Sequence, residues 1–330
     1  MGGGAVLMRG DVLCEGRYRL VNQIDLPELE RRQGSAWLAV DRMVSHRRVM
    51  IREMLVPPAR RDGAPAEYVA YTTAQRLKGL GQHPGLPHAL DFFEHRGAFF
   101  LVFFSPPGES LASLLQRQGG ALPEAVVAEY ACQLCAVLTL MQRQQPPIVH
   151  GSISPETIII NGEQHHAWLL YLPLFKPEVA QARSGRVSAG YCAPEQVHGD
   201  LTPSADLYSL AVTMHHAVTG YDPRSRLALF HPPARRLNPA VTARMEMILT
   251  RQLSLSVSQR YAHSSEMHRD LAALIAAYPA VDEQAVRMNP LELSAAQLRE
   301  QSKNAVLLNM GVFAAICVLL LVGALFAVLR

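Results

Sequence analysis

The chain has 330 residues, which is enough for one large domain or two smaller ones. Hydrophobic residues make up 49% of it and charged residues 18%, a balance that excludes a disordered chain and is typical of a packed globular protein with an added apolar segment. The formal net charge of +3 is too small to indicate a nucleic acid or a strongly acidic partner. The five cysteines are scattered, so they predict no disulfide framework and are typical of a reducing compartment.

The N-terminus shows no recognisable targeting segment. It begins Met1-Gly2-Gly3-Gly4 and has no charged stretch followed by an apolar core, as a cleavable signal peptide would have. Gly2 would suit myristoylation, but Val6 stands where that signal has Ser or Thr. Residues 1–16 are therefore predicted to be a flexible tail.

Short strands and one helix are predicted in the first part of the chain. Val49 and Ile51 alternate with polar neighbours, which is the pattern of a half-buried strand. The prolines and glycine of Pro106-Pro107-Gly108 break regular structure after the last of these strands. The predicted strands are Tyr18 to Ile24, Ala36 to Val40, Arg48 to Leu55 and Phe99 to Phe104, and the predicted helix is Tyr68 to Leu80.

Helices dominate the sequence that follows. The predicted helices are Glu109 to Arg117, Pro123 to Gln142 with its proline in the first turn, Leu207 to Val218 and Val241 to Gln252. Strands first and helices later predict an α+β protein with two unequal lobes. Residues 280–304 are polar and rich in Ala and Gln, and they are predicted to be a connector.

An apolar run follows the connector. No side chain from Ala305 to Leu329 is charged, and a helix rising about 1.5 Å per residue over this run can cross a hydrocarbon core of about 30 Å. The alternative is a buried core helix, but such helices seldom stay apolar on every face over this length. Residues 305–329 are therefore predicted to be a single-pass transmembrane helix in the cell membrane. Arg299 and Lys303 flank it, which predicts a cytoplasmic N-terminal domain.

One stretch carries the strongest functional signal, His150-Gly151-Ser152-Ile153-Ser154-Pro155-Glu156-Thr157. It resembles the catalytic loop of Ser/Thr protein kinases, whose pattern is H-R-D-x-K-P-x-N. By this resemblance Ser152 stands where the family has the Asp that accepts the substrate proton, and Ser154 where it has the Lys that steadies the phosphate. Thr157 replaces an Asn that holds a metal ion. The loop therefore keeps the His and Pro of the family pattern but lacks these three functional side chains.

The resemblance covers roughly residues 17 to 278 and implies a bilobal kinase-like fold, with a β-rich N-lobe at 17–105 and a larger helical C-lobe at 106–279. Gly34 resembles the end of the Gly-rich loop over the nucleotide phosphates, but Leu29 and Arg31 replace its earlier glycines. Glycine lets backbone N–H groups approach phosphate closely, so this loop is degenerate.

The third strand of a kinase carries V-A-I-K, and this chain has Val49-Met50-Ile51-Arg52. Arg52 keeps a positive charge but has a different shape from Lys. The usual Glu partner of that Lys would fall near Thr73 and Ala74, and neither is acidic. Met50 replaces a small residue that packs on adenine, so we expect it to fill part of the pocket.

Further departures fall on the nucleotide and metal sites. Phe103 resembles the gatekeeper, and Pro106 falls on the hinge position whose backbone N–H normally binds adenine, a group that proline lacks. Ile159 is the remaining counterpart in the adenine pocket. Tyr171 replaces the Asp of the metal-binding D-F-G motif, so with Thr157 both protein ligands for the metal are changed.

Residues that hold a kinase C-lobe together are retained. His150 begins the catalytic loop, and Asp206 resembles the helix residue that holds this loop by hydrogen bonds. Glu195, in Ala193-Pro194-Glu195, and Arg260 resemble a buried pair of the family, and we expect them to form an ion pair because a buried carboxylate is costly alone.

The resemblance therefore predicts a membrane-anchored pseudokinase of bacterial type, catalytically inactive, without cofactor or metal, which binds a protein partner such as an active kinase or its substrate. Two alternatives remain. The chain could be an atypical Ser/Thr kinase that retains ATP binding or weak activity and uses Arg52 with Glu156 or Glu163, or a tethered adaptor for phosphopeptides or lipid. Ser184 and Ser188 are candidate phosphorylation sites in the activation-segment region, and ordinary loop serines are the alternative.

Three smaller patterns have plain interpretations. Cys132 and Cys135 have metal-site spacing but fall within a predicted helix, which favours buried thiols. His215 and His216 are adjacent on a helix and point in different directions, which disfavours a shared metal. The basic pairs are interpreted as solvated faces, with a lipid-facing role for one of them as the alternative. These pairs are Arg47-Arg48, Arg60-Arg61 and Arg235-Arg236.

Overall fold

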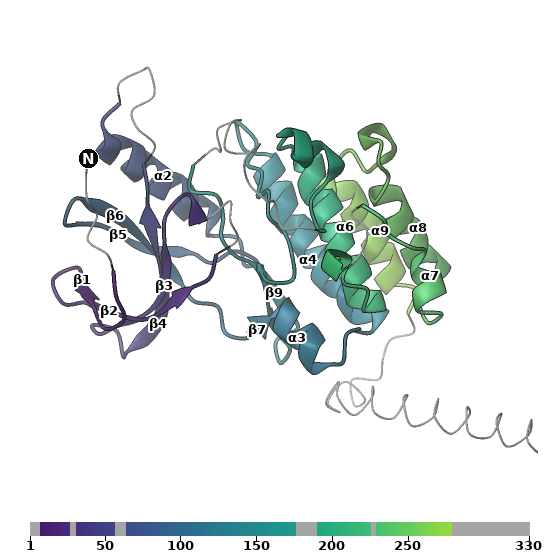
Figure 1. The fold of residues 1–330 in the computed structure, drawn as a ribbon, viewed down its shortest axis with the longest axis horizontal. Helices are drawn as coiled ribbons and strands as arrows, with labels where there is room; N and C mark the ends of the chain where they lie inside the picture. Colours follow the sequence, from purple (N-terminus) through teal and green to yellow (C-terminus); the bar gives the residue numbers. More distant parts are fainter. Residues whose placement is uncertain (1–6, 27–30, 57–63, 176–189, 226–228, 279–330) are drawn as a thin grey trace, which may run out of the picture. The chain divides into compact units, whose positions relative to one another are not determined.

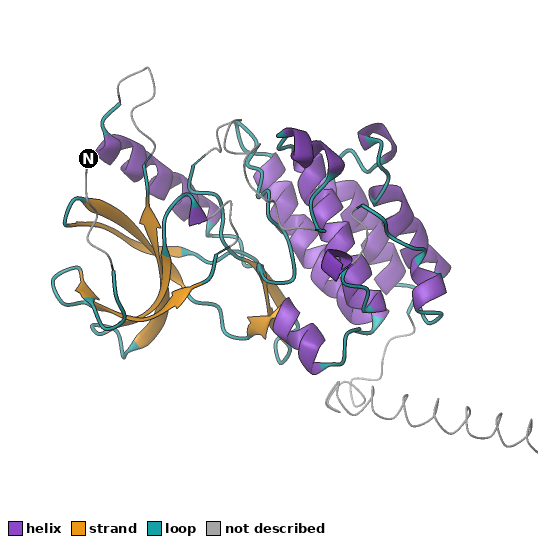
Figure 2. Cartoon of the chain, in the orientation of Figure 1, coloured by secondary structure: helices purple, strands orange, loops and turns teal. Residues whose placement is uncertain are grey.

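The structure is a computed structural model that describes residues 7–26, 31–56, 64–175, 190–225 and 229–278. The segment Met1–Ala277 forms one compact unit with two lobes, a β-rich N-lobe and a helical C-lobe (Figures 1 and 2). This bilobal arrangement is the predicted fold class. The predicted connector 280–304 and transmembrane helix 305–329 lie outside the described residues, as do Leu29, Arg60, Arg61, Ser184 and Ser188.

The N-lobe is an antiparallel sheet with strand order β1-β2-β3-β4-β6-β5. Helix α2 (Ala66–Leu80) packs against β5 and β6. The strands are β1 (Val12–Leu13), β2 (Tyr18–Ile24), β3 (Ala36–Asp41), β4 (Arg47–Met54), β5 (Ala89–His95) and β6 (Ala98–Phe104). β1 lies within the segment predicted to be a flexible tail, and its Leu13 is buried, so the ordered domain begins before residue 17.

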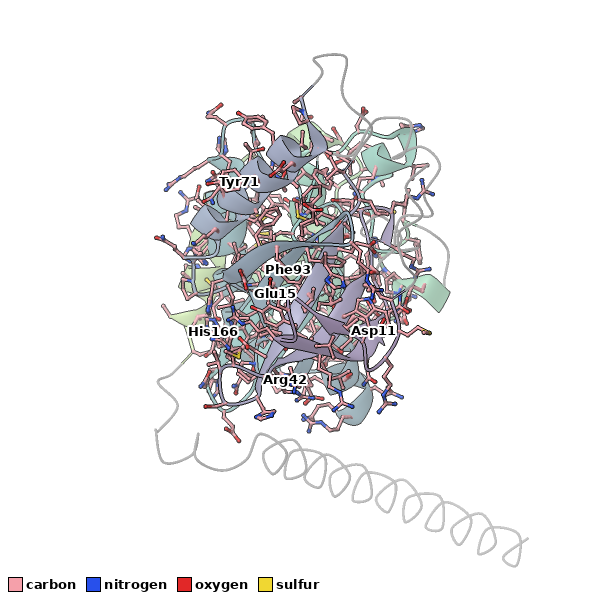
Figure 3. All side chains as sticks on the ribbon, turned by 90° about the vertical axis from the view of Figure 1, so that its left-hand side faces the viewer. Asp11, Glu15, Arg42, Tyr71, Phe93 and His166 are labelled. Carbon is pink, nitrogen blue, oxygen red and sulfur yellow. The ribbon has the colours of Figure 1, made fainter. Side chains whose placement is uncertain are left out.

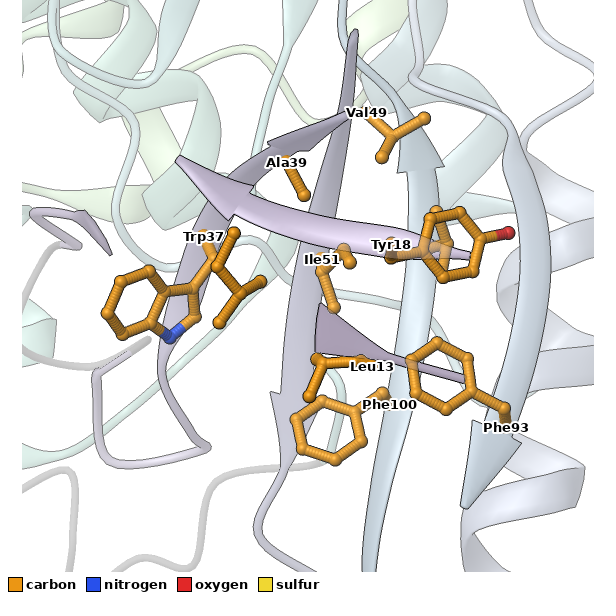
Figure 4. Close-up of a cluster of buried hydrophobic side chains, with 10 residues drawn as sticks. Leu13, Tyr18, Trp37, Ala39, Val49, Ile51, Phe93 and Phe100 are labelled. Carbon is orange, nitrogen blue, oxygen red and sulfur yellow. The ribbon is translucent and has the colours of Figure 1, made fainter. Parts of the chain in front are cut away.

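One face of this sheet builds the N-lobe core (Figure 4). Trp37 and Ile51 are buried there, and Phe93 stacks between Tyr18 and Phe100 at ring-centre distances of 5.6 and 5.4 Å. Alternate residues of a strand point to opposite faces, so the residues between these core positions face the other way. That second face of β4 and β6 carries Met50, Arg52, Leu101 and Phe103.

A buried carboxylate fastens the β3–β4 end of the sheet. Asp41 is fully buried and binds Arg17 at 3.0 Å and Arg47 at 3.5 Å. Burial alone would raise the pKa of Asp41, but hydrogen bonds from Arg17 and the backbone of Met43, with the two positive charges, hold it below its usual value. The ionised carboxylate therefore fixes where β3 ends and the turn begins.

The C-lobe combines a small sheet, ordered β7-β8-β9, with a set of helices. The long helix α4 packs against α6 and α9 at its centre. The strands are β7 (Glu109–Ser110), β8 (Ile158–Asn161) and β9 (His166–Leu169). The helices are α3 (Leu111–Arg117), α4 (Glu124–Gln142), α6 (Pro203–Thr219), α7 (Ala234–Leu237), α8 (Ala243–Gln252) and α9 (Ser264–Ile275), with short 3-10 turns η1 (Pro194–His198), η2 (Pro223–Ser225) and η3 (Val257–Gln259).

The predicted helix from Glu109 starts too early. Glu109 and Ser110 pair with β8 instead, and the helix begins at Leu111 because the Ser110 side chain accepts the N–H of Ser113 and caps it. Gly108 precedes them with φ of 126°, where a side chain would meet the carbonyl of Ile160 at 2.2 Å. Sheet pairing therefore overrides the helical pattern here.

Among the described helices, α4 alone is long and apolar enough to cross a membrane, and 56% of its apolar stretch is buried inside the protein. Its inward residues include Leu134, Leu138 and Met141, all at most 3% exposed. The helix also carries Cys132 and the buried Cys135, as predicted for thiols within a helix. We interpret α4 as the core helix of the C-lobe.

Candidate active site

The loop from His150 to Thr157 is held by a buried carboxylate of α6. Asp206 lies in the first turn of that helix, and its two oxygens accept the backbone N–H groups of His150 and Gly151, each at 2.7 Å. Burial raises the pKa of Asp206 to about 7, although the two hydrogen bonds act to lower it. This is the contact that the resemblance predicted for Asp206, and it fixes the start of the loop.

Gln196 is a buried part of this site that the sequence analysis did not single out. Its side-chain oxygen accepts the N–H of Ala193 at 2.8 Å, and its Nε2 donates to the carbonyl of Gly151 at 3.1 Å. It therefore joins η1 to the loop. Its place directly after Glu195 in the retained motif was the one signal that could have indicated it.

The predicted ion pair between Glu195 and Arg260 is present. The guanidinium binds the carboxylate at 2.7 and 3.0 Å, and the two side chains are 13% and 0% exposed. Arg260 also donates from Nε to the carbonyl of Ser254 and lies 4.7 Å over the ring of Tyr208. These contacts satisfy the buried charges and hold η1 against α6.

The replaced residues of the loop bond to the loop itself. Thr157 Oγ1 accepts the N–H of Ser154 at 3.0 Å and lies 3.0 and 3.3 Å from the carbonyls of Ser154 and Ser152, to one of which it can donate. His150 Nε2 donates to the carbonyl of Leu170 at 2.6 Å, so its Nδ1 is the acceptor that faces Ser152. The Oγ of Ser152 lies 3.4 Å from that nitrogen.

The pKa of His150 is lowered to about 4, chiefly by burial and further by the charge of Arg52. The imidazole is therefore neutral at physiological pH and a weak base. Burial likewise raises the pKa of Tyr171, and Arg52 partly opposes that shift. Arg52 of the N-lobe thus acts electrostatically on both the loop and the Tyr171 segment of the C-lobe.

The sheet face opposite the N-lobe core places Arg52 and Met50 together. Met50 pairs across the sheet with Phe103, and Arg52 pairs with Leu101. Met50 and Phe103 are each 5% exposed and Arg52 is 1% exposed. Met50 therefore lies on the same sheet face as Phe103, the counterpart of the gatekeeper, and the filling of the adenine pocket by Met50 stays a prediction.

Gly34 lies where the chain that enters β3 passes close to β4. Its φ is 135°, and a side chain there would meet the backbone carbonyl of Glu53 at 2.1 Å, so only glycine fits this close approach between β3 and β4. Ser35 beside it donates to the carboxylate of Glu53 at 2.7 Å. Arg31, at the position of an earlier glycine, forms an exposed ion pair with Asp25 at 2.8 Å.

Two N-lobe side chains bind the segment that follows Tyr171. Arg76 of α2 donates to the carbonyls of Leu174 at 3.0 Å and Pro173 at 3.4 Å. Gln33 accepts the N–H of Phe175 at 2.9 Å. Neither was predicted. Thr73 and Ala74 of α2 offer no carboxylate to Arg52. The contacts of Arg76 and Gln33 join the N-lobe to the segment after Tyr171.

The hinge follows β6 directly. Pro106 is half-buried and has no N–H to donate, and Phe104 before it donates its own N–H to the carbonyl of His88 at 2.9 Å. Ile159 is half-buried in β8 between Ile158 and Ile160, which point into the C-lobe core. Ile159 thus lies on the strand face away from that core.

The site supplies positive charge rather than carboxylates. A hydroxyl and a phenol stand at Thr157 and Tyr171, and this donor set does not fit Mg²⁺, which prefers carboxylate oxygens. Glu156 is bound by Arg224 at 2.6 Å, and Glu163 lies exposed in the β8–β9 turn. Within the described ranges, no cluster of three or more His, Cys, Asp or Glu could hold a metal ion. The cation that this sheet face brings toward the loop is the buried guanidinium of Arg52.

A sequence profile described as "Protein kinase domain" matches residues 64–288. The chain belongs to this family. The matched range includes α2, the hinge, the loop at 150–157 and the Glu195–Arg260 pair, and it begins after β4. Gly34, Met50 and Arg52 of this kinase-like domain therefore lie outside the match.

The relatives that the chain matches are named as bacterial Ser/Thr kinases. It is 24% identical over 288 residues to "Serine/threonine-protein kinase PknA" of Nostoc sp., a match covering 81% of this chain and 49% of the relative. It is 26% identical over 212 residues to "Serine/threonine-protein kinase PrkC" of Bacillus subtilis, covering 60% of this chain and 32% of the relative. The chain thus spans about half or less of the length of these relatives.

Among solved structures, the chain resembles "PpkA-294 apo form" with a TM-score of 0.57 and 20% identity, over 80% of this chain and 99% of that one. This likeness supports the bilobal fold.

The prediction that the chain is not an enzyme is contradicted by these relatives, since proteins named Ser/Thr protein kinases are enzymes. The prediction rested on side chains missing from motifs. Missing motif residues remove particular contributions to catalysis, and they do not by themselves show that a kinase domain is inactive.

Proposed function

We propose that this chain is an atypical Ser/Thr protein kinase, which holds a nucleoside triphosphate between its lobes and acts on protein substrates or partners. The observation that carries the proposal is the carboxylate of Asp206, bonded to the N–H groups of His150 and Gly151 at 2.7 Å each. Phosphoryl transfer depends chiefly on positioning and on charge stabilisation. Such a function needs this loop to be held in position, as the two hydrogen bonds of Asp206 hold it. The names of the relatives also support the proposal.

Arg52 is the residue of this chain that would stabilise the phosphates. It is a permanent cation on the sheet face toward the loop, and its charge adds to the lowering of the pKa of His150 by burial and partly opposes the raising of the pKa of Tyr171 by burial. Ser152 offers no strong base, and the neutral His150 beside it is a weak one. Since a positioned general base contributes about 10²–10⁴ in rate, we expect transfer well below the roughly 1–100 s⁻¹ of ordinary kinases.

Labelled phosphate from ATP should be incorporated slowly into Ser or Thr of a mixed peptide substrate by the purified full chain. Arg52→Ala should lower the rate about 10²-fold, as expected for loss of one preorganised donor. Arg52→Lys keeps the charge and should retain most of it. Thermal unfolding of each variant separates loss of function from loss of folding, since Arg52 is buried. Incorporation equal in the natural chain and Arg52→Ala, or no nucleotide binding with or without metal, would contradict the proposal.

We also propose that residues 305–329 anchor the domain in the cell membrane with the kinase-like domain on the cytoplasmic side. The uncharged composition of the run and the flanking Arg299 and Lys303 support this. The natural chain should resist alkaline extraction from membranes. Val318→Arg with Leu319→Arg should release it, because each arginine at the centre of such a helix costs about 2.5–3.5 kcal/mol. The matched pair Val318→Ala with Leu319→Ala should stay in the membrane, and equal behaviour of the two pairs would refute the anchor.

A further inference from the structure

The β3–β4 turn exposes apolar side chains at the edge of the N-lobe. Met43 is 77% exposed and Val44 is 40% exposed, although neither side chain is needed to close the turn. The turn itself is tight, because Arg47 donates its N–H to the carbonyl of Val44 at 2.8 Å and both Ser45 and His46 have positive φ. The apolar pair therefore lies at the end of a hairpin whose turn is closed by a backbone hydrogen bond.

Exposed arginines surround this pair. Arg42 precedes it and lies at the lower edge of the N-lobe in Figure 3. Arg19 and Arg48 are exposed as well, and both pair across the sheet with Val40, so they share one face beside the hairpin. Among the described residues, no carboxylate forms an ion pair with these three arginines.

The other charges nearby are largely compensated. Arg17 and Arg47 bind the buried Asp41, and Arg17 also binds Asp91 at 2.9 Å. Glu15, in the turn between β1 and β2, is exposed and subtracts one charge from the surface. The hairpin surface of Arg19, Arg42, Met43, Val44 and Arg48 is therefore basic with an apolar tip.

We propose that this hairpin surface docks on the anionic lipid surface of a membrane. Two apolar side chains offer too little area for a stable protein interface, which buries about 1,200–2,000 Å² in total. A lipid surface needs only a few apolar side chains at the depth of the head groups and cations above them, where arginine can extend its charge to phosphate. Because the turn is already formed, binding costs little conformational entropy. The proposal does not depend on phosphotransfer.

The test places an indole at the tip of the hairpin of the full chain. Met43→Trp should be quenched by brominated acyl chains in vesicles of phosphatidylcholine with phosphatidylserine, and far less in phosphatidylcholine alone. The natural Trp37 and Trp168 are only 5% and 7% exposed and give a constant background. Leu255→Trp is the matched control, because Leu255 is 65% exposed in a C-lobe loop and the residues next to it in the chain, Ser254 and Ser256, are uncharged. It should remain unquenched in both vesicles.

Arg42→Gln with Arg48→Gln, added to Met43→Trp, should lower the ratio of docked to free domain about fivefold for each arginine, because a basic residue near an anionic surface contributes about that much. Added salt should act in the same direction. Equal quenching at positions 43 and 255, or quenching unchanged by phosphatidylserine or by the glutamine pair, would overturn the proposal. If Trp at position 43 is not quenched by lipid but becomes buried when an acidic protein binds, the hairpin surface would instead be an interface for a protein partner.

Discussion

The triple variant Ser152→Asp, Thr157→Asn, Tyr171→Asp is expected to transfer phosphoryl groups at least about 10²-fold faster than the natural chain, the lower end of what a positioned base contributes. The change at Ser152 supplies that base beside the neutral His150. The changes at Thr157 and Tyr171 supply oxygen ligands for a hard cation. The rate of the variant should therefore become dependent on Mg²⁺, as measured by initial rates of labelled phosphate transfer with and without the metal.

The matched control carries Asn at all three positions, through Ser152→Asn, Thr157→Asn and Tyr171→Asn. It has nearly the same shape and no new charge. Its rate should stay near that of the natural chain, and thermal unfolding should show that both variants are folded. A rise of the same size in both would mean that repacking of the loop, and not a base and metal ligands, accounts for the gain. Met50 and Pro106 are left in place, so the gain is expected in kcat rather than in KM.

Arg260→Ala is expected to lower the free energy of unfolding by about 3–5 kcal/mol, because it leaves the carboxylate of Glu195 buried without its partner. The pair is nearly closed to solvent, with side chains 0% and 13% exposed. Arg260 also binds the carbonyl of Ser254 and covers the ring of Tyr208, so packing is lost as well. Denaturant unfolding at neutral pH measures the effect.

Arg251→Ala is the comparison within the same lobe. Arg251 and Glu266 lie 3.4 Å apart with side chains 43% and 31% exposed, so this pair is expected to contribute about 1 kcal/mol or less. Changing Glu195→Gln together with Arg260→Met should cost less than Arg260→Ala, since no buried charge is then left alone. Equal losses for Arg251→Ala and Arg260→Ala would contradict the structural role given to the buried pair.

The sequence predicted four of the nine described strands and five of the seven described α-helices. β2 spans the predicted Tyr18–Ile24, and β3, β4, β6 and α4 begin and end within a residue or two of prediction. β5 was missed because its residues are mostly half-buried and show no clean alternation, and β1 and β7 because strands of two residues exist only through pairing. Tertiary pairing decided these elements.

In the candidate site, too, the sequence predicted some contacts and only the tertiary structure showed the others. The motif order predicted the retained Asp206, Glu195 and Arg260, whose partners follow from the constraint that buried charges must be satisfied. It predicted none of the contacts of Arg76 and Gln33 with the segment after Tyr171, which join residues far apart in the chain. Both side chains have unremarkable sequence neighbourhoods, so no local pattern could indicate them.

The sequence by itself determined the α+β class, the two lobes and the order of the kinase-like motifs. Hydrophobic periodicity and motif spacing depend only on residues that lie close together in the chain. Only the tertiary structure decided that Arg76 and Gln33 connect the lobes, that Gln196 bonds to the loop, and that Met43 and Val44 stand exposed among arginines. These features depend on which distant segments pack together and which side chains that packing leaves uncovered, and the balance of burial, charge and hydrogen bonding that selects them is a property of the whole fold.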